Sequence, residues 1–402
     1  MHLKTRNVNS AFVELVTLFK DGEQNKTETF HRSINPITKT SSRNGPVLAI
    51  QEPVIITFEK PNERVLFNQA RDANPFFHLF ESLYMLSGGN LIEPLAYYAP
   101  QMKNYSDDGV TQNGAYGYRW RHAHNKPEAS RTTGEFEGKD QLQLLINHLK
   151  AKPDSRRAVL QMWNVEDDLL KMDTSKDICC NCCVMFSLRE ADEIMTIGGI
   201  RPKGQEHWHE HPCNMRLDMT VINRSNDLIW GTLGANVVHF SFLQEYMAAN
   251  LGVGVGVYSQ MSNNLHIYTE NNSGFKHEEW LADGTPMYYY FANDDGQLNL
   301  KMVPLIRDAA TFEDELPKFI NNACNHDFLA IYREPFLNCV ATPLLWAFEL
   351  HKKREYDLAL NALKACNADD WKIAGRNWLL KRKLNWEYKQ KGENNGISSS
   401  LE

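Results

Sequence analysis

The stretch KDICCNCCVMF, residues 176–186, holds four cysteines within five positions. Thiols this close together can bind a metal, form disulfides or include one reactive nucleophile, and each chemistry implies a different kind of protein. Disulfides are the weakest interpretation, because adjacent cysteines are poor partners for each other. Eight cysteines in a chain of 402 residues, whose first segment reads as a helix rather than a secretory leader, also indicate a reducing compartment.

A metal site is the second interpretation, because the run EHWHEHPC supplies His207, His209, His211 and Cys213. In an extended segment these alternate residues share one face, and Cys and His are zinc ligands. However, structural zinc sites separate their paired cysteines by at least two residues, and CCNCC does not. We therefore expect no metal, with the extra cysteines as small apolar strand residues and the histidine run on a surface insertion.

The third interpretation is one nucleophilic thiolate with arginines nearby. The thiolate is the reactive form of cysteine, and a neighbouring guanidinium lowers the pKa of the thiol. Arginine forks also suit a phosphate group, and Arg156, Arg157 and Arg224 flank strand-like segments near the cysteines. A single arginine is more often a solvated or salt-bridged residue, so only their combination favours an anion site.

Composition excludes several classes of protein. The net charge of −7 argues against a general nucleic-acid or membrane-surface binder, and 42% hydrophobic residues allow a large core. No apolar run is long enough to span a bilayer, which with the cysteine usage predicts a cytoplasmic protein.

Strand-like and helix-like segments alternate without strict β-α-β order, which indicates an α+β fold. Helices are predicted at 74–90, 140–150 and 236–252, and the chain is mainly helical after residue 312. A long polar loop is predicted at 105–120. Predicted strands lie at 45–61, 156–164, 182–190, 215–225, 256–268 and 286–293.

The order of seven motifs between about residues 40 and 270 resembles the thymidylate synthase superfamily. These are FESLYMLSGGN, GAYGYRWR, SRRAVLQMWN, a Cys after a short acidic loop, NRSNDLIWG, an Asn that opens a helix, and SNNLHIY. The superfamily comprises thymidylate synthases and pyrimidine-nucleotide hydroxymethylases, many encoded by phages. The resemblance implies a large mixed sheet flanked by helices over 1–311, an insertion at about 190–214, and a helical C-terminal extension at 312–402.

The spacing of the cysteines from the neighbouring family motifs predicts Cys180 as the nucleophile. The family motif around the nucleophile is Pro-Cys-His. The HPCN stretch around Cys213 keeps the proline of this motif, whereas Cys179 stands in the proline position before Cys180. A full strand must separate the nucleophile from the motif at Arg224, and Cys213 leaves too few residues for it. Asn181 stands where the family has His.

The resemblance implies further roles. Arg43, Arg224 and Ser225 would hold the nucleotide phosphate, and Arg156 and Arg157 would reach the phosphate of the other subunit, so an obligate homodimer with shared active sites is expected. His266 and Tyr268, two apart on a strand, would contact the ribose 3′-hydroxyl; a buried polar pair is the alternative.

Asn236 would recognise uracil, because one carboxamide can accept from N3–H and donate to O4 at once. The segment GTLGAN is one residue longer than the family spacing from Gly to Asn, and a plain helix cap is the alternative role.

Glu81 lies on the apolar face of its predicted helix, where an unused carboxylate is costly. By family position it would organise proton transfers through water, Tyr116 would help to remove the C5 proton, and Asp227 would hold the pterin ring. A structural salt bridge is the alternative for Asp227.

Together these features predict a one-carbon transferase that uses 5,10-methylenetetrahydrofolate and a covalent Cys-C6 adduct. Conversion of dUMP to dTMP, the methyltransferase outcome, is slightly favoured over hydroxymethylation of dUMP or dCMP. A non-catalytic RNA-binding relative with basic helices in 312–402 is a remote alternative, and neither DNA nor membrane partners are expected.

Overall fold

The computed structural model describes residues 1–24, 37–42, 44–122, 139–195, 213–270, 276–282, 290 and 300–398. A six-stranded mixed sheet, ordered β1-β4-β9-β7-β6-β5, forms its centre, and a four-stranded sheet, ordered β2-β3-β10-β8, lies beside it. The strands are β1 (His2–Thr5), β2 (Ile37–Ser42), β3 (Gly45–Ile50), β4 (Val54–Phe58), β5 (Val159–Gln161), β6 (Asn181–Met195), β7 (Cys213–Asn223), β8 (Asn226–Asp227), β9 (Gly254–Ser262) and β10 (Leu265–Tyr268). The predicted α+β class is confirmed.

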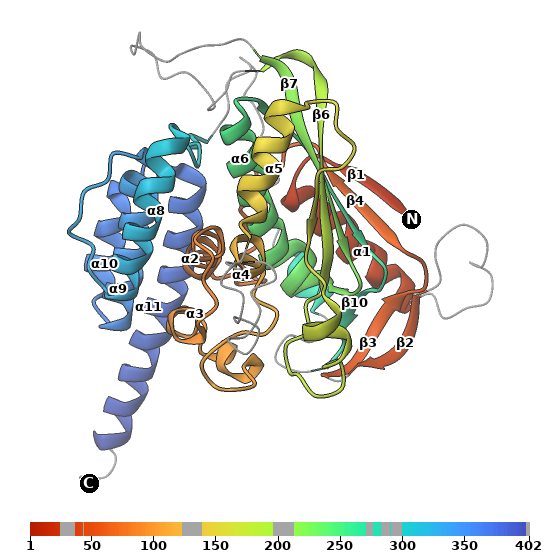
Figure 1. Ribbon diagram of the computed structural model, residues 1–402. Coiled ribbons are helices and arrows are strands. Elements are labelled where there is room, and N and C mark those ends of the chain that lie inside the picture. Colours follow the sequence, from red (N-terminus) through yellow and green to blue (C-terminus); the bar gives the residue numbers. More distant parts are fainter. Residues whose placement is uncertain are drawn as a thin grey trace.

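Helices flank the large sheet, as Figure 1 shows, with α5 and α6 beside it and α8 to α11 grouped beyond α2. The helices are α1 (Val8–Gln24), α2 (Pro75–Leu86), α3 (Ile92–Tyr98), α4 (Tyr116–Arg121), α5 (Gln141–Ala151), α6 (Asn236–Leu251), α7 (His277–Ala282), α8 (Ala309–Cys324), α9 (Thr342–Lys352), α10 (Tyr356–Ala362) and α11 (Asp369–Ser398). Among the described residues, no helix is both long and apolar enough to cross a bilayer.

Local sequence explains the two helices that carry most of the site. The Asn74 side chain caps α2 by accepting a hydrogen bond from the backbone N–H of Phe77 at 3.1 Å, and Pro75 opens the first turn. Helix α6 is buried on all sides from its first residue onward, as its apolar sequence requires. It ends at Gly252, whose φ of +71° is the left-handed cap that glycine adopts freely.

Two predicted segments differ from the structure. The first helix is preceded by strand β1, which pairs in parallel with β4. The predicted loop at 105–120 ends in the first residues of helix α4. Two arginines hold this helix in place: Arg119 pairs with Asp168 at 2.5 Å, and Arg121 pairs with Asp140 at 2.8 Å. The strand predicted at 286–293 lies almost entirely outside the described residues.

The C-terminal helices share one core with the rest of the protein. Phe242 of α6 packs against Phe336 and Trp371, at ring-centroid distances of 5.8 and 6.2 Å. The carboxylate of Glu245, also on α6, pairs with buried Arg64 and accepts from the backbone N–H of Leu305 at 2.8 Å. Burial therefore holds the extension against α6, and the division of the chain at residue 311 remains a prediction.

Three basic residues in the middle of α11 face carboxylates. Arg382 forms a two-pronged ion pair with Asp72, and Lys381 lies 3.5 Å from the same carboxylate. Lys383 pairs with Asp357 at 2.6 Å. Because these three cations are paired within the chain, they are less available for the phosphate contacts that RNA binding needs.

Candidate functional site

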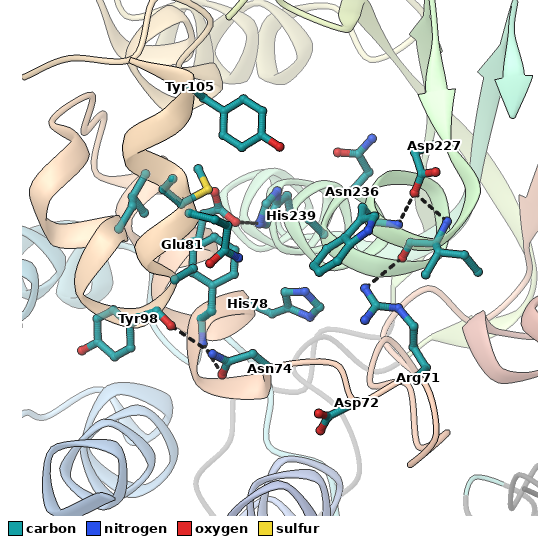
Figure 2. A pocket seen from close by; sticks show the side chains of 18 of the residues that line it. Arg71, Asp72, Asn74, His78, Glu81, Tyr98, Tyr105, Asp227, Asn236 and His239 are labelled. Carbon is teal, nitrogen blue, oxygen red and sulfur yellow. Dashed lines mark hydrogen bonds and ion pairs between the residues drawn. The ribbon is translucent and has the colours of Figure 1, made fainter. Parts of the chain in front are cut away.

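A cavity of about 890 Å³ lies between α2, α6 and α11. This is within the usual size of ligand pockets, roughly 300–1,000 Å³. Figure 2 shows Glu81 and His78 on one side and Asn236 and Asp227 on the other. Five residues predicted from the sequence line it: Glu81, Tyr116, Asp227, Asn236 and Tyr268. Helix α11 adds Trp378, Lys381 and Arg382 to the wall, which the sequence did not indicate.

The Cys180 thiol lies at the start of β6, next to Arg224. The guanidinium of Arg224 donates from Nε to the Cys179 carbonyl at 3.0 Å and from Nη2 to the Ile178 carbonyl at 2.9 Å, and Nη2 lies 3.8 Å from the Cys180 sulfur. Arg224 thus both fixes the cysteine loop and places a positive charge at the thiol. Burial raises the pKa of Cys180, and Arg224 opposes that rise.

The other cysteines are less suited to nucleophilic attack. Cys179 is fully buried, and its thiol donates to the Asn181 carbonyl at 3.0 Å. Burial raises the pKa of Cys179 well above the usual thiol value. Cys182 and Cys183 follow on β6 and are half-buried free thiols. Arg224 also opposes the rise in pKa that burial causes in Cys182, and Arg119 opposes that in Cys179, but Cys180 has the Arg224 guanidinium 3.8 Å from its sulfur.

We expect iodoacetamide to alkylate Cys180 faster as pH rises, up to and beyond pH ~8.5, because only the thiolate reacts and burial raises its pKa. Arg224→Gln should raise this pKa further and slow alkylation at neutral pH. Arg224→Lys keeps the charge and should have a smaller effect. Peptide mass spectrometry separates Cys180 from its neighbours, and a profile that levels off well below pH ~8.5 in the free enzyme would contradict the assignment.

Asn236 remains on the cavity wall despite the extra residue before it. Residues Leu228–Ala235 form a π-helical segment, the geometry in which one inserted residue is accommodated within a helix. The Asn236 carboxamide is buried, and its Nδ2 donates to the Asn226 Oδ1 at 3.1 Å. This contact fixes which end of the amide carries the donor.

Asp227 caps the π-helical segment. Its Oδ1 accepts from the backbone N–H groups of Ile229 at 3.0 Å and Trp230 at 2.5 Å. Burial raises the pKa of Asp227, while these N–H groups and the cations of His266 and Arg71 oppose the rise. The Arg71 guanidinium stacks 4.5 Å above the exposed Trp230 ring. This wall therefore offers a flat aromatic surface beside a carboxylate.

Two histidines that the sequence analysis missed join Glu81. Glu81 Oε2 lies 2.9 Å from His239 Nε2, and both side chains are buried, at 9% and 5% exposed. His78, one turn before Glu81 on α2, also lines the cavity. Burial, together with the charges of His239 and Arg71, lowers the pKa of His78 to about 3. Their spacing was a usable signal, since His78 precedes Glu81 by three residues and His239 follows Asn236 by three.

The remaining predicted residues lie at the edges of this region. Burial raises the pKa of Tyr116, with Cys179 and Cys180 adding to the rise, so its hydroxyl is close to both thiols. His266 and Tyr268 share one strand face with rings 5.5 Å apart, and His266 Nδ1 lies 3.1 Å from the Asn264 Oδ1.

The structure describes some, but not all, of the residues predicted to bind the phosphate. Ser225 is half-buried next to Arg224, whereas Arg156 and Arg157 are exposed just before β5. Exposure suits arginines that act on another subunit. Arg43 lies outside the described residues.

The described residues contain no group of three or more His, Cys, Asp or Glu side chains placed to hold a metal ion. His207, His209 and His211 lie outside the described part of the chain, and nothing is described of the Cys213 side chain. The expectation of a metal-free enzyme therefore stays a prediction.

Comparison with known proteins identifies the family of the chain. Residues 78–280 match the thymidylate synthase family. A deoxyuridylate hydroxymethyltransferase of Pseudomonas phage M6 is 38% identical over 392 residues, covering 96% of this chain and 95% of that protein. The corresponding protein of Bacillus phage SP01 is 38% identical over 242 residues, 58% of this chain and 56% of its own length. A thymidylate synthase of Corynebacterium aurimucosum is 26% identical over 199 residues, 49% of this chain and 60% of its own. The chain therefore belongs to the thymidylate synthase superfamily, in its phage branch, and is an enzyme that transfers a one-carbon unit to C5 of a pyrimidine nucleotide.

Proposed function

We propose that the enzyme converts dUMP to 5-hydroxymethyl-dUMP, with 5,10-methylenetetrahydrofolate as the one-carbon donor. The observation that carries this proposal is the extent of the phage M6 match, which covers 96% of the chain and so includes the C-terminal helices, whereas the match to the Corynebacterium synthase covers 49%. The sequence alone slightly favoured the methyl product. The C-terminal extension that this chain shares with the phage M6 protein instead favours the hydroxymethyl product, because α11 of this extension forms part of the cavity wall.

The cavity residues Asn236 and Tyr116, together with Cys180 and Arg224, which do not line the cavity, suit the first half of the reaction. Cys180 would attack C6 of the ring, which makes C5 nucleophilic, and Arg224 would support the thiolate. Asn236 would hydrogen-bond N3–H and O4, and so stabilise the developing enolate oxygen. Tyr116, near the thiol, would help to remove the C5 proton.

The nucleotide and folate would contact different groups of residues. Arg224, Ser225 and Arg43 would hold the phosphate, together with Arg156 and Arg157 of the partner subunit in a homodimer. His266 and Tyr268 would contact the ribose. The exposed face of Trp230 and the carboxylate of Asp227 offer a stacking surface and a hydrogen-bond acceptor for the pterin ring.

The second half of the reaction distinguishes the two products. Hydride transfer to the new methylene group requires a site from which water is excluded. Here the cavity wall contains Glu81, His239 and His78, which are polar groups able to hold water. This polarity favours water as the group that completes the reaction.

Mass spectrometry of the product tests the proposal. With dUMP and methylenetetrahydrofolate, we expect a nucleotide heavier by CH2O, an oxygen that derives from labelled water, and tetrahydrofolate as the second product. A nucleotide heavier by CH2, formed together with dihydrofolate, would identify a thymidylate synthase instead. The Cys180→Ser variant under the same conditions is the control for enzyme-independent chemistry.

A further inference from the structure

We propose that His239, supported by His78, positions and deprotonates the water that completes the reaction, and so determines that the product is hydroxymethylated. This inference rests on the proposed function, and it adds two residues whose roles the superfamily motifs do not assign. Both imidazoles lie with Glu81 on the cavity wall: His78 comes from α2, as Glu81 does, and His239 comes from α6, one turn after Asn236 (Figure 2).

The first support is an unfilled hydrogen-bonding position. His239 Nε2 lies 2.9 Å from Glu81 Oε2, an ion-pair distance, yet within the described residues this buried nitrogen has no aligned hydrogen-bond partner. A buried polar atom left without a partner costs about 1–3 kcal/mol. A water on the cavity side of this pair could hydrogen-bond to the imidazole nitrogen and to the carboxylate together.

The second support is the state of His78. It lies one helical turn from Glu81, and burial keeps its pKa at about 3, so its imidazole is neutral at working pH. A neutral imidazole can donate one hydrogen bond and accept another without adding charge to the site. His78 can therefore orient a water while His239 receives its proton.

The chemical step balances without a redox partner. Once tetrahydrofolate has left, the nucleotide carries a CH2 group double-bonded to C5, while Cys180 is bonded to C6. The water oxygen attacks this CH2 group, and the one proton that it loses passes to His239, whose positive charge is then balanced by Glu81. The electron pair of the CH2 double bond moves toward C4 and its oxygen, and it returns to form C5=C6 as the bond from C6 to the Cys180 sulfur breaks. The thiolate is regenerated and the hydroxymethyl group is complete.

The test compares two events in the same reaction, since loss of tritium from C5-tritiated dUMP precedes attack by water. We expect His239→Gln to lower hydroxymethyl formation by on the order of 10²-fold, the usual contribution of a general base, while tritium release falls much less. The methylene intermediate should then be captured by added 2-mercaptoethanol as a thioether. In His78→Gln, hydroxymethyl formation should also fall more than tritium release, but by a smaller factor. This variant provides the test if His239→Gln does not fold.

His351→Gln is the matched control. His351 is also a histidine whose pKa burial lowers, to about 4, but it lies on α9 and does not line the cavity. The His351→Gln variant should keep the ratio of tritium release to product formation that the native enzyme shows. Equal loss of both events in His239→Gln and His78→Gln, or no loss in either, would overturn the inference. If the native enzyme instead makes dTMP, it is the proposed function that fails.

Discussion

Replacing Cys180 with serine should abolish turnover, by on the order of 10³-fold or more, while dUMP still binds. The hydroxyl of serine is a much weaker nucleophile than a thiolate, and it ionises far less readily. The groups expected to hold the phosphate and the base are separate residues, so binding affinity should change little. Tritium release from C5-tritiated dUMP measures the chemistry, and calorimetry measures the binding.

Three neighbouring thiols provide matched controls. Cys179→Ala, Cys182→Ala and Cys183→Ala should each retain at least partial activity. Cys179→Ala should cost the most stability, because it removes a buried side chain that donates to the Asn181 carbonyl. Full activity in Cys180→Ser, or complete loss in Cys182→Ala or Cys183→Ala, would move the nucleophile to another residue.

Much of the site could be predicted because ordered motifs mark positions that the fold brings together. Glu81 lies far along the chain from Asp227 and Asn236, and the structure places all three on one cavity. Even the extra residue before Asn236 was visible in the sequence, although its π-helical accommodation was not.

The remaining features depend on how helices pack. Trp378 reaches the cavity because α11 packs on α2, with Phe76 5.3 Å from the Trp378 ring, a contact between residues 302 positions apart. The pairing of His239 with Glu81 likewise requires α2 and α6 to meet at one turn. Amphipathic periodicity shows which face of a helix is buried but not which partner covers it.

We expect the native enzyme to prefer dUMP to dCMP, and Asn236→Asp to shift that preference toward dCMP. Uracil presents a donor at N3 and an acceptor at O4, whereas neutral cytosine presents the reverse. An amide free to rotate could serve either base. Each mismatched buried group costs about 1–3 kcal/mol, which corresponds to roughly tenfold or more in kcat/KM.

The contact with Asn226 supplies the constraint on rotation. Asn226 Oδ1 accepts from Asn236 Nδ2, so the flipped amide would bring two oxygens together unless Asn226 also turned. A Cβ at Gly231 would lie 2.2 Å from this oxygen, so a glycine there leaves the space that the Asn226 amide occupies. Asn226→Ala should therefore weaken the preference for dUMP by releasing the amide, without creating the acid that Asn236→Asp introduces.

Values of kcat/KM for both nucleotides on the native enzyme, Asn236→Asp and Asn226→Ala test this account. Aspartate offers only acceptors when ionised and one donor when protonated, so it should discriminate against the O4 of uracil and favour the N4 amino group of cytosine. Asn226→Ala should lie between the native enzyme and Asn236→Asp in its ratio of dUMP to dCMP use. Equal or better use of dCMP by the native enzyme would show that the π-helical segment has displaced Asn236 from the base, and recognition of uracil would then have to come from another residue.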